Sequence, residues 1–428
     1  MKKHLARLLA AAGLVCLLSG CASRPAPAPI TMPAQDAAGS AAPVDLTAGA
    51  APAAGAQGEL TERAAAAMTD FAVRLLQNTE DGGRLLSPLS VLYALGMTAN
   101  GAKGETKAQL EQALGLSTDE LNRALYACRQ TLPAPEDGAF DTANSVWVRD
   151  EKGMSVEDGF LSAASSYYGA EIFRAAFGGS TLYAINGWVR EHTDGMIPEI
   201  LDQIPDSAML YLINAVAFKA DWAEPYADGA VADAVFTTDG GAERTVAMMR
   251  SEENLYLEDG QAEGFVKLYK GGRYAFAALL PDEGVRLADY VASLTGESLR
   301  RTLRSAQSVT VDAGLPKFTA DFGTELSRTL RALGVTDLFN PDAADLSGMA
   351  GCQGGNIAVS GVLHKTHIEV DEQGTKAAAA TAVEAAGCTA LEREPKRVIL
   401  DRPFVYLLID TQNDLPLFIG VAADPGNS

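Results

Sequence analysis

Residues 369–384 read EVDEQGTKAAAATAVE and are nearly free of large side chains. Two interpretations of this stretch compete. Alanine is the best helix former, and Gly387 could end a helix here. Read with a period of two, the residues after Gly374 instead place both charges, Lys376 and Glu384, on one parity and only uncharged residues on the other. Such a strip can form a β-strand with one buried face, and its side chains are small enough to enter between two existing strands.

Segments on both sides of this stretch complete a family pattern. Residues 372–381, EQGTKAAAAT, resemble the hinge of the reactive-centre loop in inhibitory serpins. Other serpin-like motifs follow in the family order: SPLSV (87–91), GAKG (101–104), ANSVW (143–147), YYGAE (167–171), INGWV (185–189), NAVAFKADW (214–222), LPKF (315–318), DLSGM (345–349), HK (364–365) and RPF (402–404). The resemblance extends over essentially all of residues 60–425, and ten matches in register are hard to obtain by accident.

The resemblance implies both a fold and a function. The fold is α+β, the serpin fold, with a large central β-sheet, additional sheets, about nine helices and an exposed reactive-centre loop at about residues 372–397. The function is inhibition of serine or cysteine proteases: the target cleaves the loop and forms an acyl-enzyme, and the freed loop inserts into the sheet with the protease attached. The chain would then be no enzyme. The alternative is a non-inhibitory serpin-fold binding protein on the cell surface, to which only the charged Lys376 in the hinge points.

The resemblance also assigns the loop residues. The hinge comprises Glu372, Gly374, Thr375, Ala377, Ala378, Ala379, Ala380 and Thr381. The family spacing places the reactive bond 13 positions after Thr375, between Cys388 and Thr389. Leu391 and Arg393 remain competitors, because the stretch up to Pro403 is a few residues longer than in many animal serpins. A small residue such as Cys388 fits the shallow primary pocket of an elastase-like or subtilisin-like protease, whereas Arg393 would fit a trypsin-like pocket.

A second set of residues is implied beneath the sheet. Ser87, Ser90, Asn214 and His364 match the polar cluster that controls opening of the sheet, and Trp222 matches the residue near the point where insertion starts. The alternative is that these side chains serve stability alone, through buried hydrogen bonds and core packing.

Composition excludes several classes of function. The 428 residues carry 34 basic against 55 acidic side chains, a formal charge of −21, which argues against nucleic-acid binding because phosphate contacts need clustered Lys and Arg. The common hydrolase, phosphate-loop and zinc-protease motifs are absent. His364 and His367 lie three apart in a strand-like stretch and point to opposite faces, so shared metal ligation is not expected. We expect a monomer without cofactor or metal, whose partner is the target protease.

The N-terminus indicates export. Lys2, Lys3 and Arg7 precede an apolar run that is too short to span a membrane, and LSGC at 18–21 resembles the bacterial lipoprotein cleavage box. In that interpretation residues 1–20 are a signal peptide and Cys21 is lipidated, anchoring the protein at the extracytoplasmic face of the bacterial cell membrane; the alternative is an ordinary cleavage site. Residues 22–58 contain 14 Ala, 6 Pro and 4 Gly. We therefore expect a tether over residues 21–58 and the serpin domain over 59–428.

Hydrophobic periodicity predicts a coarse set of elements. Helices are expected around 68–76, from Ser87-Pro88 to Gly101, around 185–192, and from Phe322 to Leu333. Buried strands are expected at 209–218, 274–280, 404–409 and 417–421. The last two are joined across residues 411–414 and should form a hairpin.

Overall fold

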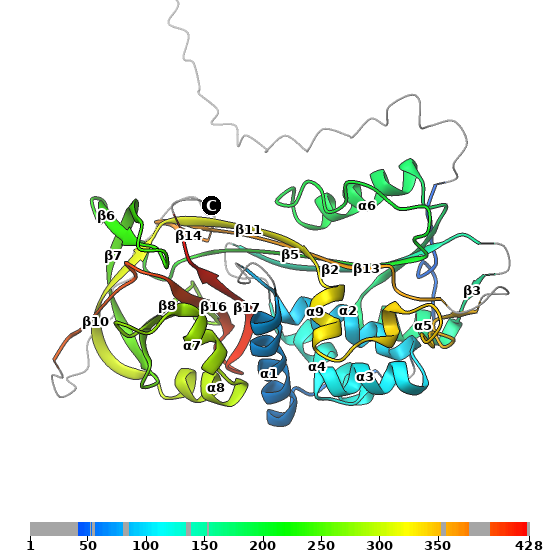
Figure 1. Cartoon of the computed structure of the whole chain (residues 1–428), viewed down its shortest axis with the longest axis horizontal. Coiled ribbons are helices and arrows are strands. Elements are labelled where there is room, and N and C mark those ends of the chain that lie inside the picture. Colours follow the sequence, from blue (N-terminus) through cyan, green and yellow to red (C-terminus); the bar gives the residue numbers. More distant parts are fainter. Residues whose placement is uncertain are drawn as a thin grey trace, which may run out of the picture. The chain divides into compact units, whose positions relative to one another are not determined.

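The computed structural model describes residues 42–51, 53, 56–79, 85–133, 138–151, 154–351, 357–375 and 394–425, all within the compact unit Met32–Ser428. The described residues contain nine α-helices (Figure 1): α1 (Glu62–Asn78), α2 (Pro88–Gly101), α3 (Gly104–Leu114), α4 (Thr118–Thr131), α5 (Asp158–Ala163), α6 (Gly179–His192), α7 (Leu287–Ser293), α8 (Gly296–Arg304) and α9 (Ser327–Ala332). A π-helical turn, η2 (Ala164–Tyr168), and a short 3-10 helix, η3 (Asp337–Phe339), complete the helical elements of this part of the chain.

The strands form three sheets. They are β1 (Val44–Asp45), β2 (Ala139–Arg149), β3 (Ser155–Val156), β4 (Glu171–Ala175), β5 (Leu210–Asp221), β6 (Val231–Thr237), β7 (Glu243–Glu258), β8 (Ala262–Leu268), β9 (Tyr274–Pro281), β10 (Gln307–Pro316), β11 (Phe318–Glu325), β12 (Ala350–Gly351), β13 (Gly361–Val370), β14 (Gly374–Thr375), β15 (Lys396–Ile399), β16 (Phe404–Asp410) and β17 (Leu415–Ala422). A mixed α+β fold with a large sheet and additional sheets is thereby confirmed.

The central sheet, which contains the predicted hinge residues Gly374 and Thr375, has seven strands in the order β1-β4-β2-β5-β14-β13-β11. β5 is buried at nearly every position, which explains its unbroken apolar sequence. β5 and β13 run parallel and pair directly from Tyr211–Gly361 to Ala217–His367. β14 lies between them only at one end. The sheet is therefore closed over most of the β5–β13 junction and open at that end.

Helices cover both faces of this sheet (Figure 1). α6 lies over one face, where Ile185, Trp188 and Val189 pack with Trp147 of β2 in a small separate core. α2 lies on the other face and is buried along almost its whole length. It begins at Pro88 and ends at Gly101, as predicted. The buried faces of β5 and β13 therefore look into a packed core.

A second sheet has the order β15-β10-β7-β8-β9-β16-β17, with β6 paired to β7. β16 and β17 form the predicted hairpin, and every residue of both strands is buried. β9 pairs with β16, so the strand predicted at residues 274–280 is also confirmed. β17 lies against α2, and its Ile419 pairs with Leu86 just before that helix. This sheet thereby forms the floor beneath one end of the central sheet.

One predicted helix is wrong in its first half. Phe322 lies in β11, not in a helix, and only the short α9 follows at Ser327–Ala332. β11 pairs with β13 along its whole length, and alternate residues Phe318, Ala320 and Phe322 are buried. A spacing of four residues between Phe322 and Leu326 fits both a helix and a strand followed by a turn. The tertiary pairing decides for the strand.

The predicted tether also ends too late in the sequence. Val44–Asp45 pair with β4 at the edge of the central sheet, and the Leu46 N–H donates to the Ile172 carbonyl at 2.7 Å. Further along, the Ala53 N–H donates to the Ser166 hydroxyl at 2.6 Å. Edge strands expose unpaired backbone groups, which a short extended segment can satisfy whatever its side chains. Part of residues 44–58 therefore belongs to the folded domain. Among the described residues, no helix has the length and apolarity needed to cross a membrane.

Candidate functional site

The first two residues of the predicted inserting strand already lie in the central sheet. Gly374–Thr375 form β14, which is antiparallel to β5 on one side and to β13 on the other. The Thr375 side chain is fully buried, and its hydroxyl is hydrogen-bonded to the Tyr269 hydroxyl at 2.8 Å. We call the junction between β5 and β13 the slot, and β14 occupies its open end.

Gly374 is required here by space. A Cβ atom at this position would lie 2.2 Å from the Ala220 carbonyl oxygen and 2.7 Å from the Asp221 Cα, both backbone atoms. Its φ angle is not in the left-handed region, so backbone freedom is not the reason for glycine here. The close approach of β14 to β5 is the reason.

A short segment after β5 holds the residues that precede β14. We call residues 222–226 the gate segment. The Trp222 N–H donates to the Gln373 carbonyl at 2.9 Å, the Trp222 indole Nε1 donates to the Asp371 carbonyl at 2.9 Å, and the Tyr226 N–H donates to the Glu372 carbonyl at 3.0 Å. The Trp222 ring is fully buried and stacks on Tyr269 at 4.4 Å between centroids. Three consecutive carbonyls at the start of the loop are thus bound to one segment.

An ion pair ties the same region to the neighbouring strand. Lys317, between β10 and β11, contacts the Glu372 carboxylate at 2.6 Å. This contact with the ammonium group lowers the pKa of Glu372. Both side chains remain partly exposed, so the pair positions Glu372 more than it stabilises the fold.

A polar cluster lies under the closed part of the slot. The Ser87 N–H donates to His364 Nε2 at 3.1 Å, and the Ser87 hydroxyl donates to the Leu417 carbonyl at 2.8 Å. Ser87 therefore precedes α2 as predicted, but its hydroxyl binds β17 and does not cap the helix. On the other side of the slot, Asn214 stands opposite His364 in the strand register and donates to Asn144 Oδ1 at 2.5 Å. The cluster spans the two strands that insertion must separate.

Several atoms of this cluster have no hydrogen-bond partner among the described residues. They are His364 Nδ1, Asn214 Oδ1 and Ser90 Oγ, all buried. Burial lowers the pKa of His364 to about 4, so its ring is neutral at neutral pH. Because Nε2 accepts from Ser87, the ring proton resides on Nδ1. Unpaired buried donors and acceptors are unfavourable, and they mark a place that a further polar group can occupy.

The segment after α6 is fastened across the sheet. The Asn186 side chain binds Ile200 and Leu201, and Lys365 of β13 donates to the Glu199 carbonyl at 2.7 Å. His367, next on that outer face, contacts Asp321 at 2.6 Å, while His364 faces the core. The prediction that these two histidines point to opposite faces is confirmed. No cluster of three or more metal-ligating side chains occurs in the described ranges.

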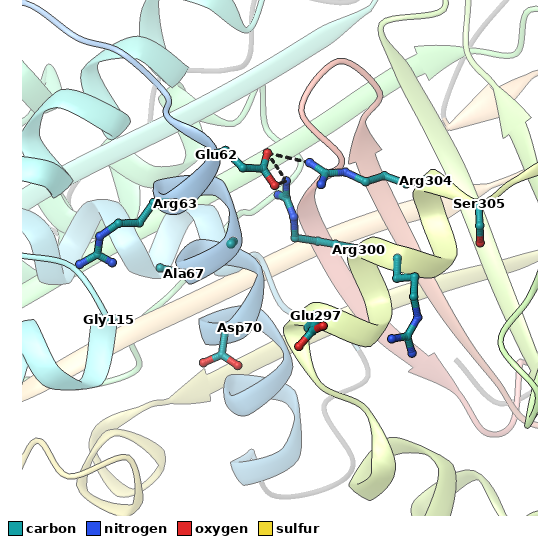
Figure 2. Close-up of a pocket in the computed structure, with 11 residues that line it drawn as sticks. Glu62, Arg63, Ala67, Asp70, Gly115, Glu297, Arg300, Arg304 and Ser305 are labelled. Carbon is teal, nitrogen blue, oxygen red and sulfur yellow. Dashed lines mark hydrogen bonds and ion pairs between the residues drawn. The ribbon is translucent and has the colours of Figure 1, made fainter.

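A cavity of about 850 Å³ lies away from the slot, between α1 and α8 (Figure 2). Glu62 in the first turn of α1 accepts from Arg304 at 2.7 Å and from Arg300 at 2.9 and 3.0 Å. These arginines lower the pKa of Glu62 to about 2. The guanidinium groups are therefore already matched by a carboxylate, and the contact fastens α1 to α8.

Comparison with known proteins decides the family. The family described as Serpin (serine protease inhibitor) matches residues 66–425. The chain belongs to the serpin family. The human leukocyte elastase inhibitor is 31% identical over 387 residues, covering 85% of this chain and all of that protein. Iripin-8 from Ixodes ricinus is 32% identical over 364 residues, covering 81% of this chain and 89% of that protein. As a serpin, the protein is a protease inhibitor by family and not an enzyme.

Solved serpin structures share the fold. The thermophilic serpin tengpin in its native state matches with a TM-score of 0.84 at 40% identity, over 90% of this chain and 100% of that chain. Tengpin in its latent state matches with a lower TM-score of 0.76, over 86% of this chain. The serpin described here is therefore closer in conformation to the native than to the latent form of that relative.

The serpin structure brings together some predicted site residues and separates others. Ser87 and His364 are in contact, Asn214 faces His364 across the slot, and Ser90 lies in the first turn of α2. Trp222 lies apart from them, beyond the other end of β5, with Glu372, Gly374 and Thr375. The remaining predicted positions lie outside the described residues: Ala377, Ala378, Ala379, Ala380, Thr381, Cys388, Thr389, Leu391, Arg393 and Cys21.

Four residues of the serpin site were missed by the sequence analysis. They are Asn144, Tyr269, Lys317 and Lys267, the last of which contacts the gate segment. Asn144 and Lys317 lie inside the serpin-like motifs ANSVW and LPKF, and this position in a family motif is the signal that could have identified them. Tyr269 and Lys267 carry no local signal, since each acquires its role from strands distant in sequence.

Proposed function

We propose that this serpin inhibits serine proteases as a suicide substrate. The target serine attacks the reactive bond as in a normal substrate, the bond breaks, and the N-terminal part of the loop stays attached as an acyl-enzyme. The loop then enters the slot before water hydrolyses the acyl-enzyme. The observation that carries this proposal is β14: two residues of the hinge already pair with both β5 and β13. Insertion would then extend a strand that has already begun, so the start of the loop does not first have to be brought to the slot.

The register of β14 indicates where each later loop residue would go. Thr375 pairs with Ala220 on β5 and with Val370 on β13. If this antiparallel pairing continues, each later loop residue lies opposite the preceding residue of β5 and of β13, so Ala377 lies between Phe218 and Ile368. Four residues further on, Thr381 arrives between Asn214 and His364. The hydroxyl of Thr381 would thus enter the polar cluster beside its unpaired buried atoms.

The side-chain sizes fit the two faces of the inserted strand. Thr375 faces the core, so the residues of the same parity, 377, 379, 381 and 383, would do so too. All are small or β-branched, and the core neighbours on β5 and β13 are fully buried. The charged Lys376 falls on the opposite parity. This arrangement favours the inhibitory over the non-inhibitory function, despite the charge in the hinge.

We infer an elastase-like or subtilisin-like serine protease as the target, with Cys388–Thr389 as the reactive bond. The small Cys388 side chain suits a shallow primary pocket. The leukocyte elastase inhibitors among the relatives support this by their names. Cleavage after Leu391 or Arg393 would indicate a different class of target, a trypsin-like one for Arg393.

We also propose that the protein acts at the cell surface, as a bacterial lipoprotein-type serpin anchored through Cys21. The support is the signal sequence, the cleavage box at 18–21 and the Ala/Pro-rich segment after it. Inhibition of proteases that approach the membrane from outside would follow.

The test uses residues 22–428, incubated with an elastase-like protease and separated on a denaturing gel. A band at the summed mass that survives denaturation supports inhibition by trapping. Cleavage without such a band supports the binding-protein alternative and contradicts the proposal. Mass spectrometry of the released C-terminal peptide locates the bond: an N-terminus at Thr389 supports Cys388, and one at Glu394 contradicts it. The cleaved protein should also melt higher than the intact one, because its loop has joined the sheet.

A further inference from the structure

A buried ion pair lies directly behind the gate segment. Lys267 of β8 is 2% exposed, and its Nζ contacts Glu253 Oε1 of β7 at 2.7 Å. Glu253 in turn accepts from the Ser251 hydroxyl at 2.6 Å. A lysine is almost never fully buried unless it is paired, because removing the charge from water is costly. This placement therefore needs an explanation.

The Lys267 ammonium also contacts the gate segment. It donates to the Glu224 carbonyl at 3.0 Å and lies 4.4 Å from the Tyr226 ring centroid and 5.4 Å from that of Trp222. Cations are attracted to the faces of aromatic rings at such distances. One buried charge thus contacts the first, middle and last residues of the five-residue gate segment from the inside.

The gate segment passes this support on to the loop. Trp222 and Tyr226 are the two residues that donate to the carbonyls of Asp371, Glu372 and Gln373. A continuous chain of contacts therefore runs from Glu253 through Lys267 and residues 222–226 to the residue before β14. In the proposed insertion, residues 371–373 stay in place while the loop residues after β14 move into the slot.

We propose that Lys267 and Glu253 form a positioning pair that fixes this point and thereby the register in which the loop inserts, an inference that rests on the proposed function. A slip of one residue would exchange the two faces of the inserted strand. Lys376 and Glu384 would then face the core, and Thr381 would face away from Asn214 and His364. Insertion would stall, and the acyl-enzyme would be hydrolysed before the protease is trapped.

An ion pair is suited to this positioning role. Buried ion pairs add little net stability compared with apolar residues of similar size, but they demand a defined geometry. The Lys267 ammonium contacts a carboxylate, a carbonyl and the faces of two aromatic rings, and this combination favours one arrangement of the gate segment. Apolar side chains of equal volume would fill the space without selecting that arrangement.

The test replaces both members together, Lys267→Met with Glu253→Gln, so that no buried charge is left unpaired. The matched control is an ion pair away from the slot, between the buried Arg300 of α8 and Glu62 of α1, 2.9 Å apart, changed to Arg300→Met with Glu62→Gln. A single Lys267→Arg variant keeps the cation. Thermal unfolding of each variant verifies that it is folded.

The first readout is the stoichiometry of inhibition, the number of serpin molecules consumed per protease trapped. We expect it to rise at least about twofold in the Lys267/Glu253 double variant, the lower range of coupling between contacting groups. The control should retain the wild-type value, and Lys267→Arg should lie between the two. The proposal is overturned if the double variant traps protease as efficiently as the wild type, or if the control is impaired equally.

The second readout needs no protease and separates this inference from the proposed function. Hydrogen exchange of the Trp222 and Tyr226 amides in the uncleaved protein should accelerate about tenfold in the double variant, the effect of losing about one net hydrogen bond. The control should show unchanged exchange at these amides. Unchanged exchange in the double variant overturns the positioning role. Absence of trapping by the wild type, with accelerated exchange in the variant, overturns the proposed function but supports the contact chain.

Discussion

The absence of a Cβ atom at Gly374 allows β14 to approach β5. We predict that Gly374→Ala excludes β14 from the slot, because the added Cβ would meet the Ala220 carbonyl oxygen at 2.2 Å. The loop should still be cleaved, but little protease should be trapped, as measured by the covalent band relative to cleaved serpin. Gly240→Ala is the matched control, since open space surrounds a Cβ there. Trapping by Gly374→Ala at the wild-type level would refute this prediction.

His364 makes stability depend on pH. Its pKa falls from 6.5 to about 4 on folding because it is buried. Above pH 6.5 the ring is neutral in both the folded and the unfolded chain, and stability is highest with respect to this group. As the pH falls from 6.5 toward 4, the unfolded chain binds a proton at this ring and the folded chain does not, so the free energy of unfolding decreases. The loss should reach about 3 kcal/mol by the linkage of pKa to stability.

The measurement is the free energy of unfolding in urea at pH 7 and pH 4, for the wild type and for His364→Gln. Gln can still accept from the Ser87 N–H, but it does not titrate. Carboxylates contribute to the pH dependence of both proteins, so only the difference between their slopes reports on His364. Equal slopes would show that this ring does not govern the acid response.

At the scale of the element, a strand formed by insertion of the loop would have one face that tolerates large side chains and one that does not. The register of β14 would place Ala379 between Val216 and Thr366, both fully buried. We predict that Ala379→Arg abolishes the rise in melting temperature after cleavage and most of the covalent complex, because a charged side chain would enter a packed interior. Lys376→Arg, on the other parity, should preserve both. Full trapping by Ala379→Arg would mean that the register is wrong.

Elements with a strong local signal could be predicted from the sequence, and those defined by distant partners could not. The hairpin of β16 and β17 and both ends of α2 follow from apolar runs, turn residues and Pro88. Apolar spacing predicts a helix at Phe322, because the strand partner that decides its conformation lies over 40 residues away in β13. The local sequence around Lys267 gives no sign of burial, because the side chain is buried by β7 and the gate segment, which are distant in sequence. In the same way, the low-complexity sequence around Val44 conceals its pairing with β4.

At the scale of the whole molecule, the proposed lipid anchor would determine which proteases the serpin meets. We predict that Cys21→Ser moves the protein from the membrane fraction to the soluble fraction when it is expressed in a bacterium, because the acylated thiol is lost. The purified variant should inhibit as well as the wild type, since the tested domain is unchanged. Membrane association that persists in Cys21→Ser would show that another feature holds the protein there.

If the protein is anchored through Cys21 as proposed, the pairing of Val44–Asp45 with β4 shortens the segment between the lipid and the folded domain. A generic flexible linker as long as residues 22–58 has a root-mean-square end-to-end distance of about 33 Å, whereas one as long as residues 22–43 has about 26 Å. The volume swept around the lipid falls by about half, which raises the local concentration of the bait correspondingly. Inhibition would then be confined to a thin layer next to the bilayer, and proteases that remain farther from the membrane would not be inhibited.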